Sequence, residues 1–407
     1  MRLTRLIFTL FMVLTVQVVS QTKVSLDEAV SMALKYNPVL IEQQSFINKA
    51  KIEIDDANRY PNPSLNMSWE HLGSDGQTAG EWIVGGSMPL NFLWERKHNI
   101  ASKELLHRSL LMTVEQTKYE VLARLKKAYL NYDHLNRLAA FYDSTLRLLV
   151  GLEVASQSKL EAGDISKYEL QRISLEIRKY RNDLMLLEQE RDAALLDLKL
   201  LTGQQTDTEK WLSEQIPLDS AGINGEAMIE YALKNRFDIK ALDLRIESEK
   251  KGLEYNESKQ FPGIELGAGY KRQYDNFAGP VIQLNVEVPL FGRNRKETEL
   301  SGEEIRSLTI SRKLLTDQIV TRVKFAAEKY QLMKENYAGG RISDLDGMLE
   351  TAMISYTKGE LSLVEFLDGV GSYINGSRMN ADLALRMLES RIELENAAGF
   401  DAHLSNQ

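Results

Sequence analysis

The chain has 407 residues with ordinary apolar and charged fractions, a formal net charge of −8 and no cysteine. The missing cysteines exclude disulfides, thiolate metal sites, a cysteine nucleophile and a lipid anchor on an N-terminal cysteine. The acidic balance argues against a nucleic-acid-binding protein, because no basic excess is present to neutralise phosphates.

The first twenty residues have the layout of a secretory signal peptide. Arg2 and Arg5 form a short positive region, the run from Leu6 to Val19 is almost wholly apolar, and short residues end it at 18–20. A membrane anchor is the alternative, although the run is short for a span. We expect residues 1–20 to be a signal peptide and the rest, which has no long apolar run, to be exported without a transmembrane helix.

Two short helices and a β-hairpin are predicted next. Ser25 and Glu28 have the spacing of a capping box, and Pro38 can occupy the first turn of a second helix. Apolar and polar residues then alternate on both sides of a polar turn at 73–81. This pattern predicts a hairpin over residues 63–90.

Long helices are predicted after the hairpin, because residues 90–216 lack proline and show a heptad pattern typical of a coiled coil. The seam positions are Val121, Leu125, Ala128, Tyr132, Leu135, Ala139, Tyr142, Leu146 and Leu149, followed in a return helix by Ile173, Ile177, Tyr180, Leu184 and Leu187. The same spacing recurs at Ile319, Val323, Ala326, Tyr330 and Met333. Antiparallel coiled-coil helices are therefore expected.

The plan occurs twice, which indicates a duplicated unit. "ALKYNPVL" (33–40) matches "ALKNRFDI" (232–239), "MPLNFLWERK" (88–97) matches "VPLFGRNRKE" (288–297), and "AGDISKYEL" (162–170) matches "KGELSLVEF" (358–366). We divide the chain into repeat 1 at 21–202, an equatorial linker at 203–224, repeat 2 at 225–398 with its hairpin at 263–291, and a C-terminal tail at 399–407.

Helix lengths predict how the helices fit together. In each copy about 70 residues separate the Pro-Leu pair from the matched glycine, or about 100 Å of helix. The return helix from Ser166 to Leu201 is about half as long. The helix after Pro38 is shorter still, at about 35 Å. Two short helices placed end to end would therefore nearly match one long helix.

Each copy turns from strand to helix at a Pro-Leu pair, Pro89-Leu90 and Pro289-Leu290. Each proline is expected to end its strand because it cannot donate to a sheet, and Gly292 lets the second copy turn freely. Basic residues follow in the first helical turns. Their positions are compatible with contact to lipid head groups and equally with simple solvation. They are Arg96, Lys97, Arg293, Arg295 and Lys296.

Four strands in one chain cannot close a barrel, and open sheet edges are hazardous in water and excluded from lipid. An exported chain with alternating strands of bilayer-spanning length predicts transmembrane strands, and four from each of three chains would give a twelve-stranded β-barrel. Aromatic residues cluster near the expected strand ends, as they do in membrane barrels. An ordinary soluble hairpin is the alternative for either hairpin alone.

This ordered series of motifs, in duplicate, resembles the outer-membrane efflux proteins of the TolC type over nearly the whole chain after residue 20. The resemblance implies a mainly α fold with a small β part. It also implies a homotrimer with a barrel in outer-membrane lipid and a periplasmic α-helical tube. Its implied function is the exit duct of a tripartite efflux system, beside a periplasmic adaptor (membrane fusion) protein and an inner-membrane pump.

The resemblance also implies functional residues. The helix turns that form the narrow periplasmic tip match Gly163, Asp164, Gly359 and Glu360, which are expected to contact the adaptor. The pore gate then falls on Glu365, Asp368, Glu169 and Tyr356. Three copies of the acidic residues around one axis would attract cations, whereas a merely solvated helix face is the alternative. Leu361 stands where some members carry an arginine that links neighbouring helix pairs. This chain therefore departs from the family at that link.

Other functions explain less of the chain. Five histidines without an i, i+4 pair, and no phosphate loop or nucleophile elbow, argue against an enzyme, a cofactor or a metal site. A secreted coiled-coil scaffold or adaptor would explain the heptads but not the paired hairpins. Among channels, the outer-membrane component of a type I protein secretion system is the alternative. The compact length weakly favours the heavy-metal type.

Overall fold

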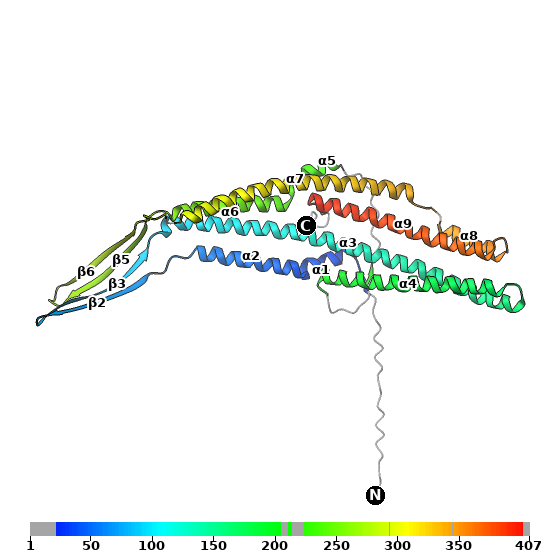
Figure 1. The fold of residues 1–407 in the computed structure, drawn as a ribbon, viewed down its shortest axis with the longest axis horizontal. Coiled ribbons are helices and arrows are strands. Elements are labelled where there is room, and N and C mark those ends of the chain that lie inside the picture. The colour runs from blue at the N-terminus through cyan, green and yellow to red at the C-terminus, as the bar shows by residue number, and fades with distance from the viewer. Residues whose placement is uncertain (1–21, 205–210, 214–223, 293, 344, 402–407) are drawn as a thin grey trace, which may run out of the picture.

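The computed structural model describes residues 22–204, 211–213, 224–292, 294–343 and 345–401. They form a long, gently curved body with a β-sheet at one end and antiparallel helices along the rest (Figure 1). The expected signal peptide at 1–20 lies outside the described residues, as do most of the linker and of the tail. Within the described ranges, no helix combines the length and the hydropathy needed to cross a membrane.

The two repeats hold the same order of elements. The first contains α1 (Leu26–Tyr36), α2 (Pro38–Ala57), β2 (Ser64–Ser74), β3 (Gln77–Pro89), α3 (Phe92–Ala162) and α4 (Lys167–Thr202). The second contains α5 (Gly225–Asn235), α6 (Phe237–Ser258), β5 (Gly263–Gln273), β6 (Ala278–Glu287), α7 (Arg295–Gly340), α8 (Leu345–Thr357) and α9 (Leu363–Ala398). Short strands β1 (Thr22–Val24) and β4 (Trp211–Ser213) pair in parallel. The expected fold class, mainly α with a small β part, is confirmed.

Local signals start the first helices as predicted. The Ser25 hydroxyl accepts a hydrogen bond from the Glu28 backbone N–H, and the Glu28 carboxylate accepts one from the Ser25 backbone N–H. Pro38 is the first residue of α2, where its missing N–H costs nothing. Both predictions are confirmed.

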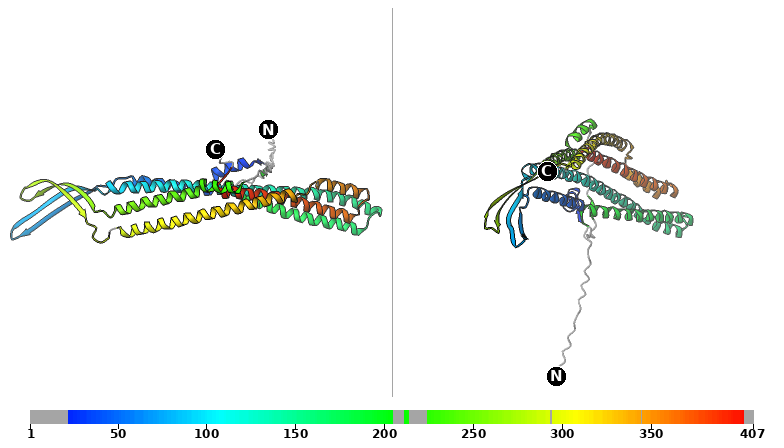
Figure 2. Two further views of the ribbon diagram at one scale, coloured as in Figure 1. Left: turned by 90° about the horizontal axis from the view of Figure 1, so that it is seen from above. Right: turned by 60° about the vertical axis from the view of Figure 1, so that its left-hand side comes forward.

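The four long strands form one antiparallel sheet in the order β2-β3-β5-β6. Each hairpin pairs with itself, and the two repeats join through β3 and β5, in a register that runs from Glu81 opposite Gln273 to Pro89 opposite Glu265. Figure 2 shows that this sheet extends beyond the helices and bends away from them. The sheet is thus built half from each repeat.

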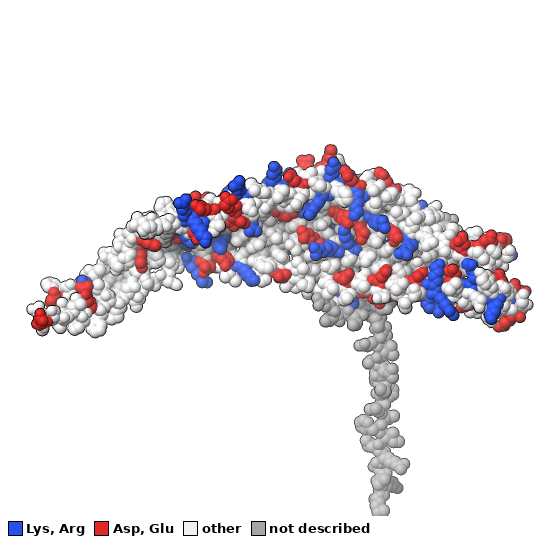
Figure 3. All heavy atoms as spheres, viewed as in Figure 1, with Lys and Arg blue, Asp and Glu red and all other residues white. Residues whose placement is uncertain are grey.

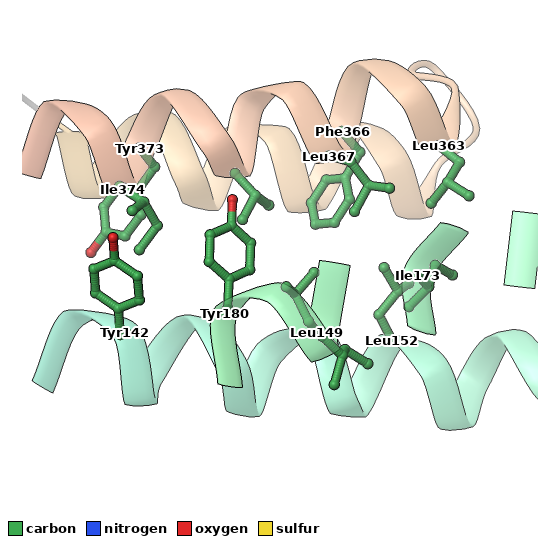
Figure 4. Close-up of a cluster of buried hydrophobic side chains, with 12 residues drawn as sticks. Tyr142, Leu149, Leu152, Ile173, Tyr180, Leu363, Phe366, Leu367, Tyr373 and Ile374 are labelled. Atoms are coloured by element: carbon green, nitrogen blue, oxygen red, sulfur yellow. The ribbon is translucent and has the colours of Figure 1, made fainter. Parts of the chain in front are cut away.

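The heptad seam is the core of the helical body. Val121, Leu125, Tyr132, Tyr142 and Leu149 of α3 are buried, as the coiled-coil spacing predicts. Figure 4 shows the cluster nearest the tip, where side chains from α3, α4 and α9 meet. Its fully buried members are Leu149, Ile173, Phe366 and Val370. Both repeats therefore contribute to one apolar core near the tip.

Short helices meet end to end at mid-length, as their lengths predict (Figure 1). In repeat 1 the Asn37 amide accepts from the Val39 N–H at the start of α2 and donates to the Leu201 carbonyl at the end of α4, at 2.8 Å. In repeat 2 the matched residue is Arg236, which donates to the Ala397 carbonyl at the end of α9, at 2.6 Å. One buried side chain thus joins the two helix ends in each repeat.

The long helix expected in repeat 2 is not continuous, so this prediction is wrong. α7 ends at Gly340 and α8 begins at Leu345, whereas α3 runs unbroken from Phe92 to Ala162. The absence of proline suggested continuity, but two consecutive glycines, Gly339 and Gly340, end α7 and have low helix propensity.

A side chain on α9 satisfies the backbone at this break. The Asn380 amide accepts a hydrogen bond from the Ile342 N–H at 2.9 Å and donates one to the Ile342 carbonyl at 2.8 Å. The helix opposite is also smaller there, because Gly376 and Asn380 occupy the positions that Tyr180 and Leu184 hold in α4. A large residue at 376 would collide with Leu345, whose Cδ2 lies 2.8 Å from the position of an added Cβ.

Candidate functional site: the sheet, the junctions and the helix tips

One face of the sheet is apolar and exposed. Pairing places alternate residues of all four strands on the same face. The large members of this face are Leu65, Met67, Trp69, Val84, Leu266, Tyr270, Ile282, Leu284 and Val286, all exposed. Leu65 and Ile282 reach 83% and 80% exposure, on the two outer strands. A continuous apolar face of this kind marks an interaction site.

The opposite face is polar and internally hydrogen-bonded. Ser87 of β3 is its centre: its hydroxyl accepts from the Asn66 amide at 3.0 Å, lies 2.8 Å from the Ser64 hydroxyl and donates to the Glu265 carboxylate. Farther along the sheet, Lys271 forms an ion pair with Glu81. The sheet therefore separates an apolar surface from a polar one.

The two outer strands have free edges within the described residues. β2 pairs only with β3, and β6 only with β5. Three antiparallel steps separate β2 from β6, so these edges run in opposite directions and can pair with each other in an antiparallel manner. In the view of Figure 3 the sheet carries few charges, unlike the helices, so charge does not protect these edges.

Aromatic side chains occupy the turn end of the sheet. The β2–β3 turn is an Asp75-Gly76 pair with positive φ at both residues, which is the usual two-residue hairpin turn. Nearby, the Trp69 indole N–H donates to the Tyr274 hydroxyl at 2.9 Å, and His71 lies 3.1 Å from the same oxygen. These contacts tie β2 to the β5–β6 turn.

The two strand-to-helix junctions differ in detail. Pro89 is the last residue of β3, and the Leu90 N–H still donates to the Ile264 carbonyl at 2.8 Å. In repeat 2 the strand ends at Glu287, before Pro289, and Leu290 is exposed. Gly292 has φ of +74°, which confirms that this turn needs a glycine-type conformation.

The basic residues after the junctions have separate roles. Arg96 donates to the Asn58 carbonyl at 3.1 Å and lies 4.7 Å from the centre of the Tyr60 ring, so it fastens the end of α2 to the start of α3. Arg295 forms an exposed pair with Glu299. Arg293 lies outside the described residues. Arg96 is therefore structural and not simply solvated.

The predicted tip turns are helix ends at which the backbone takes the left-handed conformation. Gly163 directly follows the end of α3 and has φ of +82°. Gly359 lies two residues after the end of α8 and has φ of +76°. The backbone N–H groups of Asp164 and Glu360 reach back to carbonyls five residues earlier, the pattern of a Schellman motif. Both turns lie at the same end of the body, opposite the sheet (Figure 1).

Two of the predicted gate residues are capping residues. Glu169 accepts from the backbone N–H of Ser166 at 2.7 Å, and Glu365 accepts from that of Ser362 at 2.8 Å. These backbone bonds, and bonds from the same serine hydroxyls, lower the pKa of both carboxyls. The S-x-x-E spacing at each turn is the signal that would have identified these capping boxes.

The other two predicted gate residues are placed differently. Tyr356 stacks on Phe366 with ring centres 4.9 Å apart, and burial raises the pKa of its hydroxyl. The Lys159 ammonium of α3 lies 5.8 Å from the same ring, so Tyr356 links the two tip turns within one chain. Asp368 is exposed, on the first turns of α9. Within the described part of the chain, no cluster of three or more metal-binding side chains occurs.

Sequence reasoning did not identify the three side chains that hold the helices together. These are Asn37 and Arg236, which join helix ends, and Asn380, which closes the break after α7. The repeat alignment pairs Asn37 with Arg236, but their different chemistry hides the shared role. No local pattern marks Asn380, because its partner Ile342 lies 38 residues away.

Comparisons with known proteins agree with this geometry. No protein-family model matches the chain. "Toxin and drug export protein A" of Aggregatibacter actinomycetemcomitans is 22% identical over 251 residues, covering 60% of this chain and 55% of that protein. The chain thus spans about half the length of the curated relative that it matches.

Solved structures resemble the chain over almost its full length. CusC is 18% identical with a TM-score of 0.74, covering 92% of both chains. The outer-membrane channel CmeC of Campylobacter jejuni is 13% identical with a TM-score of 0.74, covering 94% of this chain and 88% of that one. A membrane protein of Pseudomonas aeruginosa is 17% identical with a TM-score of 0.73, covering 92% of each. The chain has the fold of these proteins, which confirms the fold expected from the TolC-type resemblance.

Proposed function

We propose that this chain is an outer-membrane channel, the exit duct of a tripartite efflux system, and that it works as a homotrimer. The sheet carries the proposal: one exposed apolar face, one polar face and two unpaired edges that run in opposite directions. Unpaired backbone groups at a strand edge are not tolerated in lipid. A sheet with an apolar face of this kind must therefore be closed by other chains. In this arrangement the apolar face contacts outer-membrane lipid and the polar face lines the pore.

Three chains would give twelve strands, with β6 of one protomer pairing with β2 of the next. The even strand number and the opposite edge directions are compatible with an antiparallel membrane barrel. The helices then continue the barrel as a periplasmic tube. The likeness to solved channels supports this assembly, and the fold of each protomer leaves both edges available for it.

At the far end, we place the gate and the partners. The tip turns at Gly163, Asp164, Gly359 and Glu360 would contact a periplasmic adaptor protein, which connects the duct to an inner-membrane pump. Of the acidic gate residues, Glu169 and Glu365 are engaged in capping boxes. Asp368 makes no hydrogen bond or ion pair within the described ranges, so its charge is the one most available to a cation in the pore.

A protein-secretion role is the second candidate. The name of the curated relative includes both toxin and drug export, so it supports small-molecule efflux and type I protein secretion alike. The heavy-metal type remains a weaker prediction from length. In each case the transported substrate would be chosen by the inner-membrane partner, since a duct needs no specific substrate site.

The function can be tested with the purified chain. We expect it to fractionate with the outer membrane, to be extracted as a trimer in detergent and to form channels in planar bilayers. A monomer that stays in buffer without detergent and forms no channels would contradict the proposal and favour a secreted coiled-coil scaffold.

The gate can be tested separately. We expect Asp368→Ala to weaken block of the channel by divalent cations, because it removes the unpaired carboxylate. Glu365→Ala combined with Asp368→Ala should change conductance as well, since it also loosens the start of α9. Unchanged cation block in the double variant would remove the gate assignment while leaving the channel proposal intact.

A further inference from the structure

A cavity of about 390 Å³ lies where α3, α7 and α9 surround Arg236, the residue before α6. This is the level at which α6 and α9 meet end to end (Figure 1). Its volume falls in the range of small-molecule sites, about 300–1,000 Å³. The cavity is distant from the sheet and from the tip turns, and the proposed duct function does not use it.

Two buried hydrogen-bond acceptors line this cavity without a partner. They are the Gln116 Oε1 of α3 and the Asn396 Oδ1 of α9, and neither has a donor within the described residues. Gln116 is 7% exposed, and its amide nitrogen donates to Glu120 at 3.3 Å. A buried acceptor that has lost its water costs free energy unless a donor replaces it.

The other repeat lacks these polar groups. The positions matching Gln116 and Asn396 are Leu314 of α7 and Leu200 of α4. Both leucines are exposed, at 55% and 42%, so buried amides at these positions are particular to this cavity. Amides at both positions, facing one cavity, indicate a ligand that brings N–H or O–H donors.

Two arginines at the same cavity keep their charges unpaired. Arg124 of α3 and Arg322 of α7 are matched positions of the two repeats; both are exposed, and neither forms an ion pair within the described residues. The other cations that line the cavity have ion-pair partners. Lys127 lies 2.6 Å from the Glu393 carboxylate, which it shares with Lys329, and Arg236 forms an ion pair with Asp238.

We propose that this cavity binds a small zwitterion of the amino-acid or short-peptide class. Its carboxylate would lie between Arg124 and Arg322, because guanidinium groups bind carboxylates through paired hydrogen bonds. Its ammonium group would donate to Gln116 Oε1 and Asn396 Oδ1. A fully ionised anion offers no donor to these acceptors, and a simple amine leaves both arginines unpaired.

Binding can be measured on the full chain in detergent, with the dipeptide Gly-Gly as the probe. Acetate and ethylammonium are the single-charge controls. We expect saturable calorimetric or NMR binding of the dipeptide, with each control binding about tenfold more weakly, since each loses one set of hydrogen bonds. No saturable dipeptide binding would overturn the proposal. Acetate binding as tightly as the dipeptide would assign a simple anion site and would also overturn it.

Matched variants locate the site. Arg124→Gln with Arg322→Gln should weaken dipeptide binding about tenfold or more. Gln116→Leu with Asn396→Leu removes two buried acceptors that lack a donor, so the chain should fold with unchanged or higher Tm and lose its preference for the dipeptide over acetate. Arg306→Gln, on α7 outside the cavity, is the control and should bind normally. Undiminished binding by the arginine variant, or a preserved preference in the leucine variant, would contradict the assignment.

Discussion

The first repeat runs to the tip and back through two unbroken helices, α3 and α4, whereas the second runs there through α7, a break and α8 and returns through α9. The α3–α4 seam holds large residues such as Ile173 and Tyr180. At the matching positions α9 has Gly369 and Gly376. At these two places α8 approaches α9 closely, with Ala352 near Gly369 and Leu345 near Gly376. The comparison shows that the two halves of the tip are packed by different means.

The mid-length joints also differ between the repeats, because one uses a charged arginine and the other a neutral amide. Removing these side chains should give the largest effects on stability. Arg236→Ala removes a buried cation from Asp238 and from the end of α9, which should cost about 3 kcal/mol because the partner is left uncompensated. Asn37→Ala removes a helix cap and one neutral bond, and should cost about 1 kcal/mol. Thermal unfolding in detergent tests the order. Equal losses would show that charge does not distinguish the joints.

The break after α7 should be weakened by making α9 resemble α4. Asn380→Leu introduces the residue found at position 184 and removes both hydrogen bonds to Ile342. We expect a loss of about 1 kcal/mol, seen as about fivefold faster hydrogen exchange in α8. Exchange in α4 should be unchanged. Unaltered exchange in α8 would indicate that packing alone holds the break.

The reverse change is the control for that prediction. Leu184→Asn places an amide in the continuous seam of α4, where no broken backbone is available to receive it. We expect α3 and α4 to lose stability by about 1–2 kcal/mol without gaining a break, because Leu187 and the seam around it still pack. A break in α3 would show that residue 184 alone decides helix continuity.

The tip caps should respond equally in the two repeats. Ser166→Ala and Ser362→Ala each remove one capping box, and each should cost about 1 kcal/mol at its helix start. Amide exchange in the first turns of α4 and α9 measures this. A much larger loss at Ser362 would indicate that the break after α7 also weakens the start of α9.

Acid should produce the smallest effect. The pKa values of Glu169 and Glu365 are lowered by bonds from the serine backbone, so their stabilisation is present above the ordinary carboxyl pKa and is lost as pH falls through the lowered one. The protection of the first-turn amides, taken relative to their intrinsic exchange rate at each pH, should fall over that acidic range. Glu169→Gln and Glu365→Gln should remove this pH dependence. Persistence of the dependence in these variants would assign it to other groups.

Much of the architecture could be predicted because its signals are local and periodic. Heptad spacing, strand alternation and the positions of prolines predicted the helices and the hairpins, and the TolC-type resemblance implied the tip turns. The capping role of Glu365 was also readable, since Ser362 and Glu365 repeat the spacing of Ser25 and Glu28. The break after Gly340 was missed, because the lack of proline was given more weight than the Gly339-Gly340 pair and the amide that closes the break comes from another helix. The cavity beside Arg236 was not predicted either, since residues from three helices and Arg236 itself form it.

The account depends on closure of the sheet by neighbouring chains, and the cysteine-free sequence allows a direct test. One cysteine at Ser68 on β2 can be combined with single cysteines at successive positions along β6, such as Gln283, and oxidised in native outer membranes. We predict a ladder of covalent products that ends at the trimer, with crosslinking at alternate β6 positions. Products that stop at the monomer at every β6 position, from protein that is folded and in the membrane, would contradict the account.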